Sequence, residues 1–301
     1  MDRSNLNRNL VILGAGYVGS ALATAARESG WAVSALTRNQ SRIETLERLG
    51  IAAIQARTDE PGWESMMPPE VQGVVYCASS ASRSVEGYRA SYIDGQERAL
   101  KWAETAGVEH YIYTSSTSVY GEALGEWVDE DSGPWSDTEY ARVLLDAEEQ
   151  VLSAALPSTV LRLSGLYGPG RHLLWDRVAE TVGDSLPGFG DTYLNLAHRD
   201  DCVSAILALL DCEREDSQLF NLADDQPFTR QGIVDWCCEQ LGKPRLTFVP
   251  ERASEDRRAA RFASGRRPNR RIRADKIKRA LSWAPQYRDF RAGYRGIGLV
   301  D

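Results

Sequence analysis

The length and charge of the chain exclude several classes of protein. It has 301 residues, of which 43 are acidic and 35 are basic, and its net charge is −8. A chain of this length can bury a large core, as one composite unit or as two domains. The negative charge gives no general reason to expect binding to nucleic acid or to an anionic membrane surface.

Cysteine usage and hydropathy indicate a reducing compartment. The five cysteines form an odd set without a C-x-x-C pair. We therefore expect reduced thiols, and neither a disulfide framework nor a metal site. Residues 1–9 lack the apolar stretch of a signal peptide, and no run approaches the roughly 18 apolar residues of a membrane span. These features predict a cytoplasmic protein without a membrane partner.

The first informative stretch runs from Leu10 to Ala26. It opens with four apolar residues suited to a buried strand and ends with apolar residues at helical spacing. The six residues after the strand match G-x-G-x-x-G: Gly14, Ala15, Gly16, Tyr17, Val18 and Gly19. In this motif the first glycine allows a tight turn, the second admits a pyrophosphate, and the third lets helix and strand pack closely. The sequence therefore predicts dinucleotide binding, with a glycine-rich structural turn as the alternative.

The end of the second expected strand, near residues 31–36, indicates which dinucleotide binds. An NAD site usually has a carboxylate about 20 residues beyond the glycines, whereas a nearby arginine suits the 2′-phosphate of NADP. Here Thr37 and Arg38 occupy that position. The sequence therefore favours NADP(H), with NAD(H) binding and a solvated arginine as the alternative.

Strands and helices alternate along the first half of the chain. Further strands are expected near residues 52–54, 71–78 and 111–114, which predicts a Rossmann-type, doubly wound parallel sheet. The small residues Ala78 and Ser79 follow the fourth strand, at an edge where such sheets bind ligands. We expect both to contact the cofactor.

Several later segments carry a resemblance to a known family. The sequence Ser115-Ser116-Thr117-Ser118-Val119-Tyr120-Gly121 resembles the S-S-x-x-V-Y-G segment of the extended short-chain dehydrogenases/reductases, also called the NAD-dependent epimerase/dehydratase family. Three further segments are similar to that family's in the same order: residues 161–170, 198–201 and 220–225. The resemblance spans most of the chain and is identified with an atypical branch of the family.

The expected elements divide the chain into two parts. Residues 1–165 would form the dinucleotide-binding domain, and residues 166–301 a smaller substrate-binding region. A helix at residues 200–210 and a strand at residues 218–222 would return to the Rossmann side, at about 198–224, so the second region is discontinuous. The resemblance further implies that Ser164 and Leu166 lie near the nicotinamide.

The expected catalytic residues match the family pattern only in part. The family uses a serine or threonine and a Tyr-x-x-x-Lys pair, in which the lysine favours the phenolate of the tyrosine. Ser116 matches the serine and Tyr140 lies at the distance of the tyrosine, but Leu144 stands where the lysine would be. Either Tyr140 is a catalytic acid whose cation comes from elsewhere, or the site has lost or replaced the family chemistry.

Two functions from different classes follow. The first is an NADP(H)-dependent oxidoreductase or epimerase/dehydratase-like enzyme that acts on a small polar or anionic molecule. The second is a redox-silent NADP(H)-binding sensor or scaffold. A small-molecule substrate is the expected partner, with a homodimer as one expected assembly.

The segment from Arg257 to Arg279 is strongly basic, with Asp275 as its one acidic residue. It is interpreted as a solvated loop and helix that pair with the acidic remainder, or as an anion-binding flap, since guanidinium groups suit phosphate and carboxylate. It lacks the interleaved aromatic residues of a nucleic-acid-binding surface.

Overall fold

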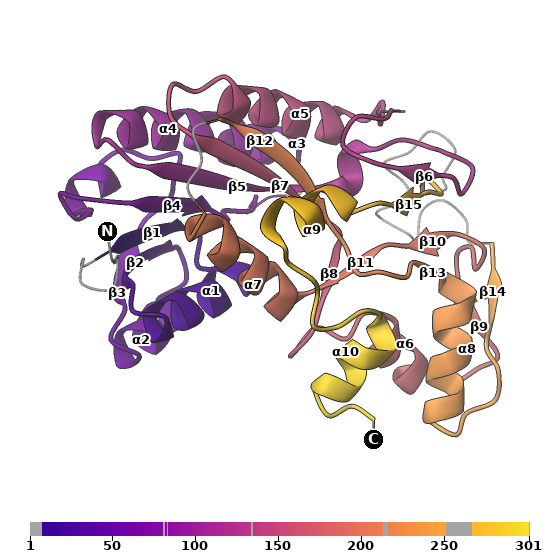
Figure 1. Ribbon diagram of the computed structural model, residues 1–301. Helices are drawn as coiled ribbons and strands as arrows, with labels where there is room; N and C mark the ends of the chain where they lie inside the picture. The colour runs from indigo at the N-terminus through magenta and orange to yellow at the C-terminus, as the bar shows by residue number, and fades with distance from the viewer. Residues whose placement is uncertain are drawn as a thin grey trace. The chain divides into compact units, whose positions relative to one another are not determined.

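The computed structural model describes residues 8–80, 82, 84–133, 135–212, 216–250 and 267–300 (Figure 1). The chain divides into two compact units. The first unit comprises the residues up to Ser116, Arg142–Arg162 and Cys202–Phe220. The second comprises Thr117–Ala141, Leu163–Asp201 and the residues from Asn221 onward. Neither unit is continuous in sequence.

A seven-stranded sheet forms the centre of the first unit. Its strands lie in the spatial order β12 (Gln218–Leu222), β7 (Ser158–Leu163), β5 (His110–Ser116), β4 (Gly73–Tyr76), β1 (Asn9–Leu13), β2 (Ala32–Thr37) and β3 (Ala52–Gln55). The four pairs from β3 to β5 are parallel. The four apolar residues at the end of β1 are fully buried, as expected for a central strand covered on both faces. The predicted doubly wound parallel sheet is confirmed.

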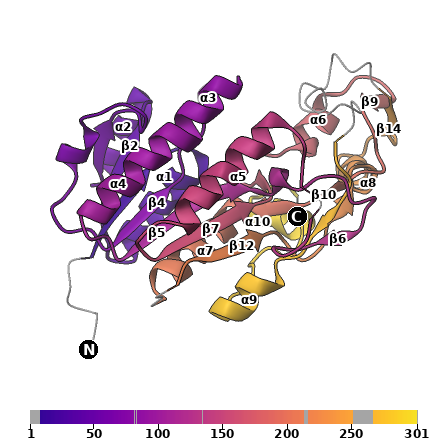
Figure 2. The ribbon, with the colours of Figure 1, turned by 90° about the horizontal axis from the view of Figure 1, so that it is seen from above.

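Helices cover both faces of this sheet (Figures 1 and 2). In Figure 1, α4 and α5 lie on one face, and α1, α2 and α7 lie on the other. The helices are α1 (Tyr17–Glu28), α2 (Gln40–Arg48), α3 (Val85–Arg89), α4 (Gly95–Thr105), α5 (Glu139–Leu152) and α7 (Arg199–Leu210). A π-helical turn at Ala90–Asp94 joins α3 to α4. Among the described helices, none has the length and hydrophobicity of a membrane span.

The strand order reverses between β1 and β4. From β1 the chain builds outward to β2 and β3, then returns to β4 on the other side and continues to β5. Open parallel sheets bind ligands outside the carboxyl ends of the strands at such a reversal. Because β1 ends at Leu13 and β4 ends at Tyr76, residues 14–16 and 77–79 follow the two strands at this point.

The second unit consists of short elements around an aromatic core. Its two-stranded sheets pair β8 (Gly165–Tyr167) with β11 (Leu196–His198), β9 (Ser185–Pro187) with β14 (Thr247–Val249), β10 (Tyr193–Leu194) with β13 (Phe228–Thr229), and β6 (Trp127–Val128) with β15 (Arg271–Ile272). Its helices are α6 (Leu174–Glu180), α8 (Arg230–Gln240), α9 (Asp275–Leu281) and α10 (Phe290–Gly296). Trp236 packs edge-on against Phe290, with ring centroids 5.1 Å apart. Buried aromatic pairs of this kind stabilise a core that few regular strands support.

A buried ion pair ties helix α5 to the sheet of the first unit. Glu148 and Arg162 are almost completely buried, and the Arg162 Nη2 donates to Glu148 Oε2 at 2.6 Å. The Ser115 hydroxyl, near the end of β5, donates to Glu148 Oε1 at 2.6 Å. One carboxylate on α5 therefore binds a side chain from β5 and another from β7.

Replacing Glu148 with glutamine is expected to destabilise the protein strongly. The change keeps the shape of the side chain but leaves the Arg162 guanidinium buried without a countercharge, which typically costs about 3–5 kcal/mol. Urea denaturation measures the free energy of unfolding. The control is Glu149→Gln at the exposed neighbouring position, which should change stability by less than about 0.5 kcal/mol. Equal effects of the two substitutions would show that the buried pair contributes little.

Candidate functional site

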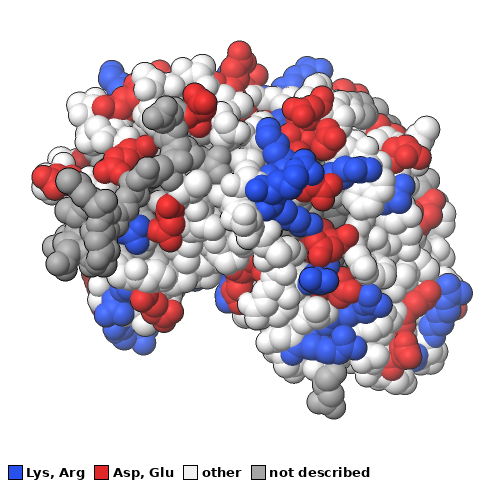
Figure 3. Space-filling model, viewed as in Figure 1, with Lys and Arg blue, Asp and Glu red and all other residues white. Residues whose placement is uncertain are grey.

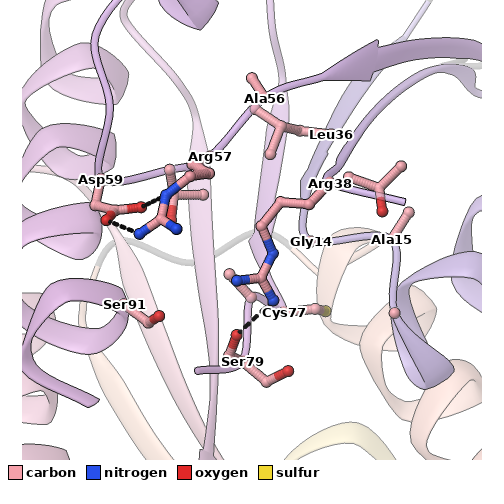
Figure 4. Close-up of a pocket in the computed structure, with 14 residues that line it drawn as sticks. Gly14, Ala15, Leu36, Arg38, Ala56, Arg57, Asp59, Cys77, Ser79 and Ser91 are labelled. Carbon is pink, nitrogen blue, oxygen red and sulfur yellow. Dashed lines mark hydrogen bonds and ion pairs between the residues drawn. The ribbon is translucent and has the colours of Figure 1, made fainter. Parts of the chain in front are cut away.

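A pocket lies at the carboxyl edge of strands β1 to β4 in the first unit. It is lined by residues 14–16, 36–38, 56–59 and 77–79, together with Ser91 (Figure 4). Each of the four ranges spans or follows the end of a different parallel strand. The reversal in strand order therefore coincides with a concave site.

The three glycines of the G-x-G-x-x-G motif have different structural surroundings, and two of them leave no room for a side chain. Gly14 has a φ of +110°, and a Cβ there would lie 2.4 Å from the backbone nitrogen of Ala78. A Cβ on Gly19 would lie 2.2 Å from the Gly14 carbonyl oxygen. The fold itself therefore requires both glycines.

Gly16 differs because the fold leaves open space beside it. It is exposed, and a Cβ there would have no described atom within 4 Å. Helix α1 begins at the next residue, with no cap from a described side chain. Bare backbone at a helix N-terminus, beside a pocket, suits a phosphate group. Tyr17 is half-buried and Val18 is buried, and contact of either with a cofactor stays a prediction.

Arg38 reaches across one end of the pocket. Its exposed side chain extends from the end of β2, and its Nη2 donates to the Ser79 carbonyl at 3.4 Å. Thr37 is buried, and its hydroxyl oxygen accepts a hydrogen bond from the Asn39 backbone amide at 3.3 Å. Ala78 also lines the pocket. The predicted residues Thr37, Arg38, Ala78 and Ser79 thus share one pocket with the glycines.

Two charged residues that follow strand β3 were not predicted from the sequence. Arg57 and Asp59 line the same pocket and form an ion pair, in which the Arg57 Nε donates to Asp59 Oδ1 at 3.1 Å. Partial burial acts to raise the pKa of Asp59, but the hydrogen bond from Arg57 and the nearby charges hold it below its usual range. The signal was available, since β3 ends at the same sheet edge that drew attention to Ala78.

Cys77, which also lines the pocket, is unsuited to nucleophilic chemistry. Burial raises the pKa of its thiol to about 12, and the reactive form of cysteine is the thiolate. All five cysteines of the chain are described, and none forms a disulfide.

Ser116 and Tyr140 lie at element ends. Ser116 is the half-buried last residue of β5, next to the Ser115 side chain that binds Glu148. Tyr140 is half-buried in the first turn of α5.

The helix face that follows Tyr140 carries no cation in its next turn. Leu144 is buried, with 4% of its surface exposed, and Arg142 is exposed. Two turns beyond Tyr140, Glu148 binds Arg162 through both Nε and Nη2. The guanidinium of Arg162 is therefore engaged in the buried ion pair, and an apolar side chain fills the place of the expected lysine.

Ser164 and Leu166 belong to the second unit. Ser164 is buried, and its amide donates to the Leu222 carbonyl at 3.0 Å. Among the described residues, its hydroxyl has no hydrogen-bond partner. Leu166 is half-buried in β8, opposite Ala197 of β11.

The segment His198–Asp201 has a structural role in the second unit. Asp201 accepts the amide of Gln286 at 2.7 Å, which holds the C-terminal segment in place. Burial raises the pKa of Asp201 to about 6 and lowers that of His198 to about 4. The His198 ring packs against the Tyr287 ring, with ring centroids 4.0 Å apart. Neither side chain belongs to the pocket of the first unit.

Part of the basic segment lies outside the described residues, namely Arg257 to Arg266. Of the remainder, Lys278 pairs with Asp225, and the Arg271 guanidinium lies 4.9 Å from the centre of the Trp127 ring. Figure 3 shows Lys and Arg side chains gathered over α9, with acidic side chains beside them. In the described part of the chain, no group of three His, Cys, Asp or Glu side chains could hold a metal ion.

Comparisons with known proteins point to one family. Residues 10–223 match the model of the NAD dependent epimerase/dehydratase family. The chain is 29% identical to the protein YeeZ of Escherichia coli, over 67% of this chain and 73% of that protein. It is 26% identical to a UDP-glucose 4-epimerase of Corynebacterium glutamicum, over 94% of this chain and 92% of that protein. A solved structure of MoeE5 in complex with UDP-glucuronic acid and NAD has a TM-score of 0.78 at 21% identity and covers 96% of each chain.

The two glycines Gly14 and Gly16 are expected to respond differently to alanine. Gly16→Ala should cost about 1 kcal/mol or less in stability, yet weaken NADH and NADPH binding by about tenfold or more, because the methyl group fills the phosphate space. Gly14→Ala should destabilise the fold by more, through its positive φ and its contact with Ala78. Thermal denaturation and calorimetric titration measure the two effects. Unchanged affinity of Gly16→Ala for both cofactors would contradict phosphate binding there.

Proposed function

The chain belongs to the NAD-dependent epimerase/dehydratase family, and we propose that it is an NADP(H)-dependent oxidoreductase or epimerase/dehydratase-like enzyme. The single observation that carries this proposal is the exposed backbone of Gly16, which lines the pocket at the N-terminus of α1 and has open space beside it. The fold requires the other two motif glycines, Gly14 and Gly19, whereas no close contact excludes a side chain at position 16. A bound pyrophosphate gives a reason for a glycine there.

The residues of the first unit suit each part of a dinucleotide. The backbone at Gly16 and the N-terminus of α1 would hold the pyrophosphate, and Arg38 would bind a 2′-phosphate. Ala78 and Ser79 would contact the cofactor between these points. That Ser164 and Leu166 lie near a bound nicotinamide stays a prediction from the family resemblance. When bound, the nicotinamide supplies hydride transfer.

Ser116 and Tyr140 would act on the oxygen of the substrate. Both hydroxyl groups can hydrogen-bond a carbonyl or hydroxyl oxygen, and a tyrosine can also donate or accept a proton. We propose that Tyr140 works as a proton donor to the substrate oxygen, which suits reduction of a carbonyl group.

The substrate is proposed to be a small polar or anionic molecule. The named relatives include a UDP-glucose 4-epimerase, and MoeE5 was solved with UDP-glucuronic acid. Nucleotide sugars are therefore the first class to test, followed by short keto acids. The free thiols of all five cysteines support a reducing, cytoplasmic setting. A homodimer stays a prediction.

A redox-silent NADP(H)-binding sensor or scaffold is the second candidate. The buried Leu144 in place of the family's lysine is the observation that favours it. Such a protein would bind NADPH tightly without turnover of any substrate.

Arg38→Ala is expected to remove most of the preference for NADPH. A charged hydrogen bond to the 2′-phosphate contributes about 1.5–3 kcal/mol, so NADPH affinity should fall by about tenfold to a hundredfold. NADH affinity should stay nearly constant, since NADH lacks that phosphate. Calorimetric titration of both cofactors tests this. Equal affinities of the wild-type protein for NADH and NADPH would contradict the proposed cofactor choice.

Tyr140→Phe tests catalysis directly. The substitution keeps the ring but removes the proton donor, so turnover should fall by about a hundredfold or more, while NADPH affinity stays constant. Ser116→Ala should also impair turnover. The assay follows NADPH consumption with a panel of nucleotide sugars and short keto acids. Tight NADPH binding without turnover of any panel member would favour the sensor or scaffold instead.

A further inference from the structure

We infer that Arg57 is a second binding residue for the 2′-phosphate of NADP(H), together with Arg38. This inference rests on the proposed function and extends its cofactor site. Arg57 follows strand β3, whereas Arg38 follows strand β2. The sequence pattern that singled out Arg38 gave no indication of Arg57.

The two arginines extend from neighbouring strand ends. Strands β2 and β3 are parallel, with Thr37 opposite Gln55, and the Ala56 amide donates to the Thr37 carbonyl at 3.2 Å. Arg38 and Arg57 each follow these paired backbone positions directly. Both line the pocket, and Figure 4 shows their side chains projecting from adjacent strand ends. The backbone pairing therefore keeps the two cations at one end of one pocket.

Asp59 balances only one of the two positive charges. It is the single acidic residue among those that line the pocket, and Arg38 and Arg57 are the two basic ones. The Asp59 carboxylate accepts hydrogen bonds from the Nε and Nη2 of Arg57. Both arginines lower the pKa of Asp59. Glu60 also pairs with the Arg57 Nε, at 3.1 Å, but its side chain is 64% exposed. The residues that line the pocket thus include one more basic than acidic side chain, and Glu60 is a more exposed second carboxylate beside Arg57.

Arg57 also retains hydrogen-bonding capacity. Its hydrogen bonds to Asp59 use Nε and Nη2, and within the described part of the chain no hydrogen bond is made by Nη1. Its side chain is 40% exposed, whereas that of Asp59 is 16% exposed. Asp59 therefore holds the guanidinium in orientation while its outer edge stays accessible. A guanidinium held in this way loses little freedom when it binds a phosphate.

A phosphate dianion explains this arrangement better than a local ion pair. An ion pair with an arginine this exposed contributes at most about 1 kcal/mol to stability, so stability alone gives little reason to turn Arg57 into the pocket. Two guanidinium groups line the pocket with one carboxylate, and the second carboxylate beside Arg57, that of Glu60, is exposed to solvent, which leaves the lining attractive to a further anion. The adenosine ribose of NADPH carries such an anion at its 2′ position, and that of NADH does not.

Titration of the full-length protein with NADPH, NADH, 2′-AMP and 5′-AMP tests the inference. The variants are Arg57→Ala, Arg38→Ala, the double substitution, and Arg48→Ala as a control. Arg48 is exposed on α2 and does not line the pocket, so the control removes the same charge elsewhere. Circular dichroism and thermal denaturation establish that each variant is folded. Arg57→Lys shows whether the paired geometry of arginine is needed.

Arg57→Ala is expected to lower the affinity for NADPH and for 2′-AMP about tenfold. The affinities for NADH and 5′-AMP should change by less than about twofold. Arg48→Ala should leave all four affinities unchanged. Arg57→Lys should restore part of the loss. Unchanged NADPH affinity in Arg57→Ala, while Arg38→Ala loses affinity, would overturn the role of Arg57 and leave the proposed function intact. Equal losses for NADPH and NADH would also overturn it. Absence of binding of either dinucleotide to the wild-type protein would instead reject the proposed function.

Discussion

The close approach of three backbone segments at the end of strand β1 is the constraint on which the rest of the first unit depends. Gly14 contacts the backbone at Ala78 with no room for a side chain, and Gly19 contacts Gly14 in the same way. These contacts fix where helix α1 starts relative to β1 and β4. The exposed backbone of Gly16 lies at this start of the helix, and the amides of Gly14 and Ala15 donate to the Leu36 carbonyl near the end of β2.

A second constraint acts through helix α5. Glu148 binds Ser115 and Arg162 in the buried interior, so the helix that carries Tyr140 and the strand that ends at Ser116 are each held by this ion pair. Between Tyr140 and Glu148 on this helix lies Leu144, whose apolar side chain is buried. In helix α5 an apolar side chain therefore stands where the family resemblance leads us to expect a lysine.

The sequence predicted the parallel sheet well because each of its strands is a short apolar run bounded by turn residues. It could not predict the two-stranded sheets of the second unit, since pairs such as Tyr193–Leu194 with Phe228–Thr229 depend on contacts between distant segments. Arg57 follows the third expected strand, at the sheet edge where ligands bind, and could have been considered on that ground, but only the pairing of β2 with β3 shows that it neighbours Arg38. The Glu148–Arg162 ion pair joins helix α5 to strand β7, and no local sequence pattern predicts such a pair.

The central claim is that the pocket at the carboxyl edge of β1 to β4 binds NADP(H). A crystal structure determined with NADPH tests it most directly. The account predicts electron density for the pyrophosphate beside Gly16 and for the 2′-phosphate within hydrogen-bonding distance of both Arg38 and Arg57. Density for NADPH at another site, or a pocket without dinucleotide at saturating NADPH, would contradict it.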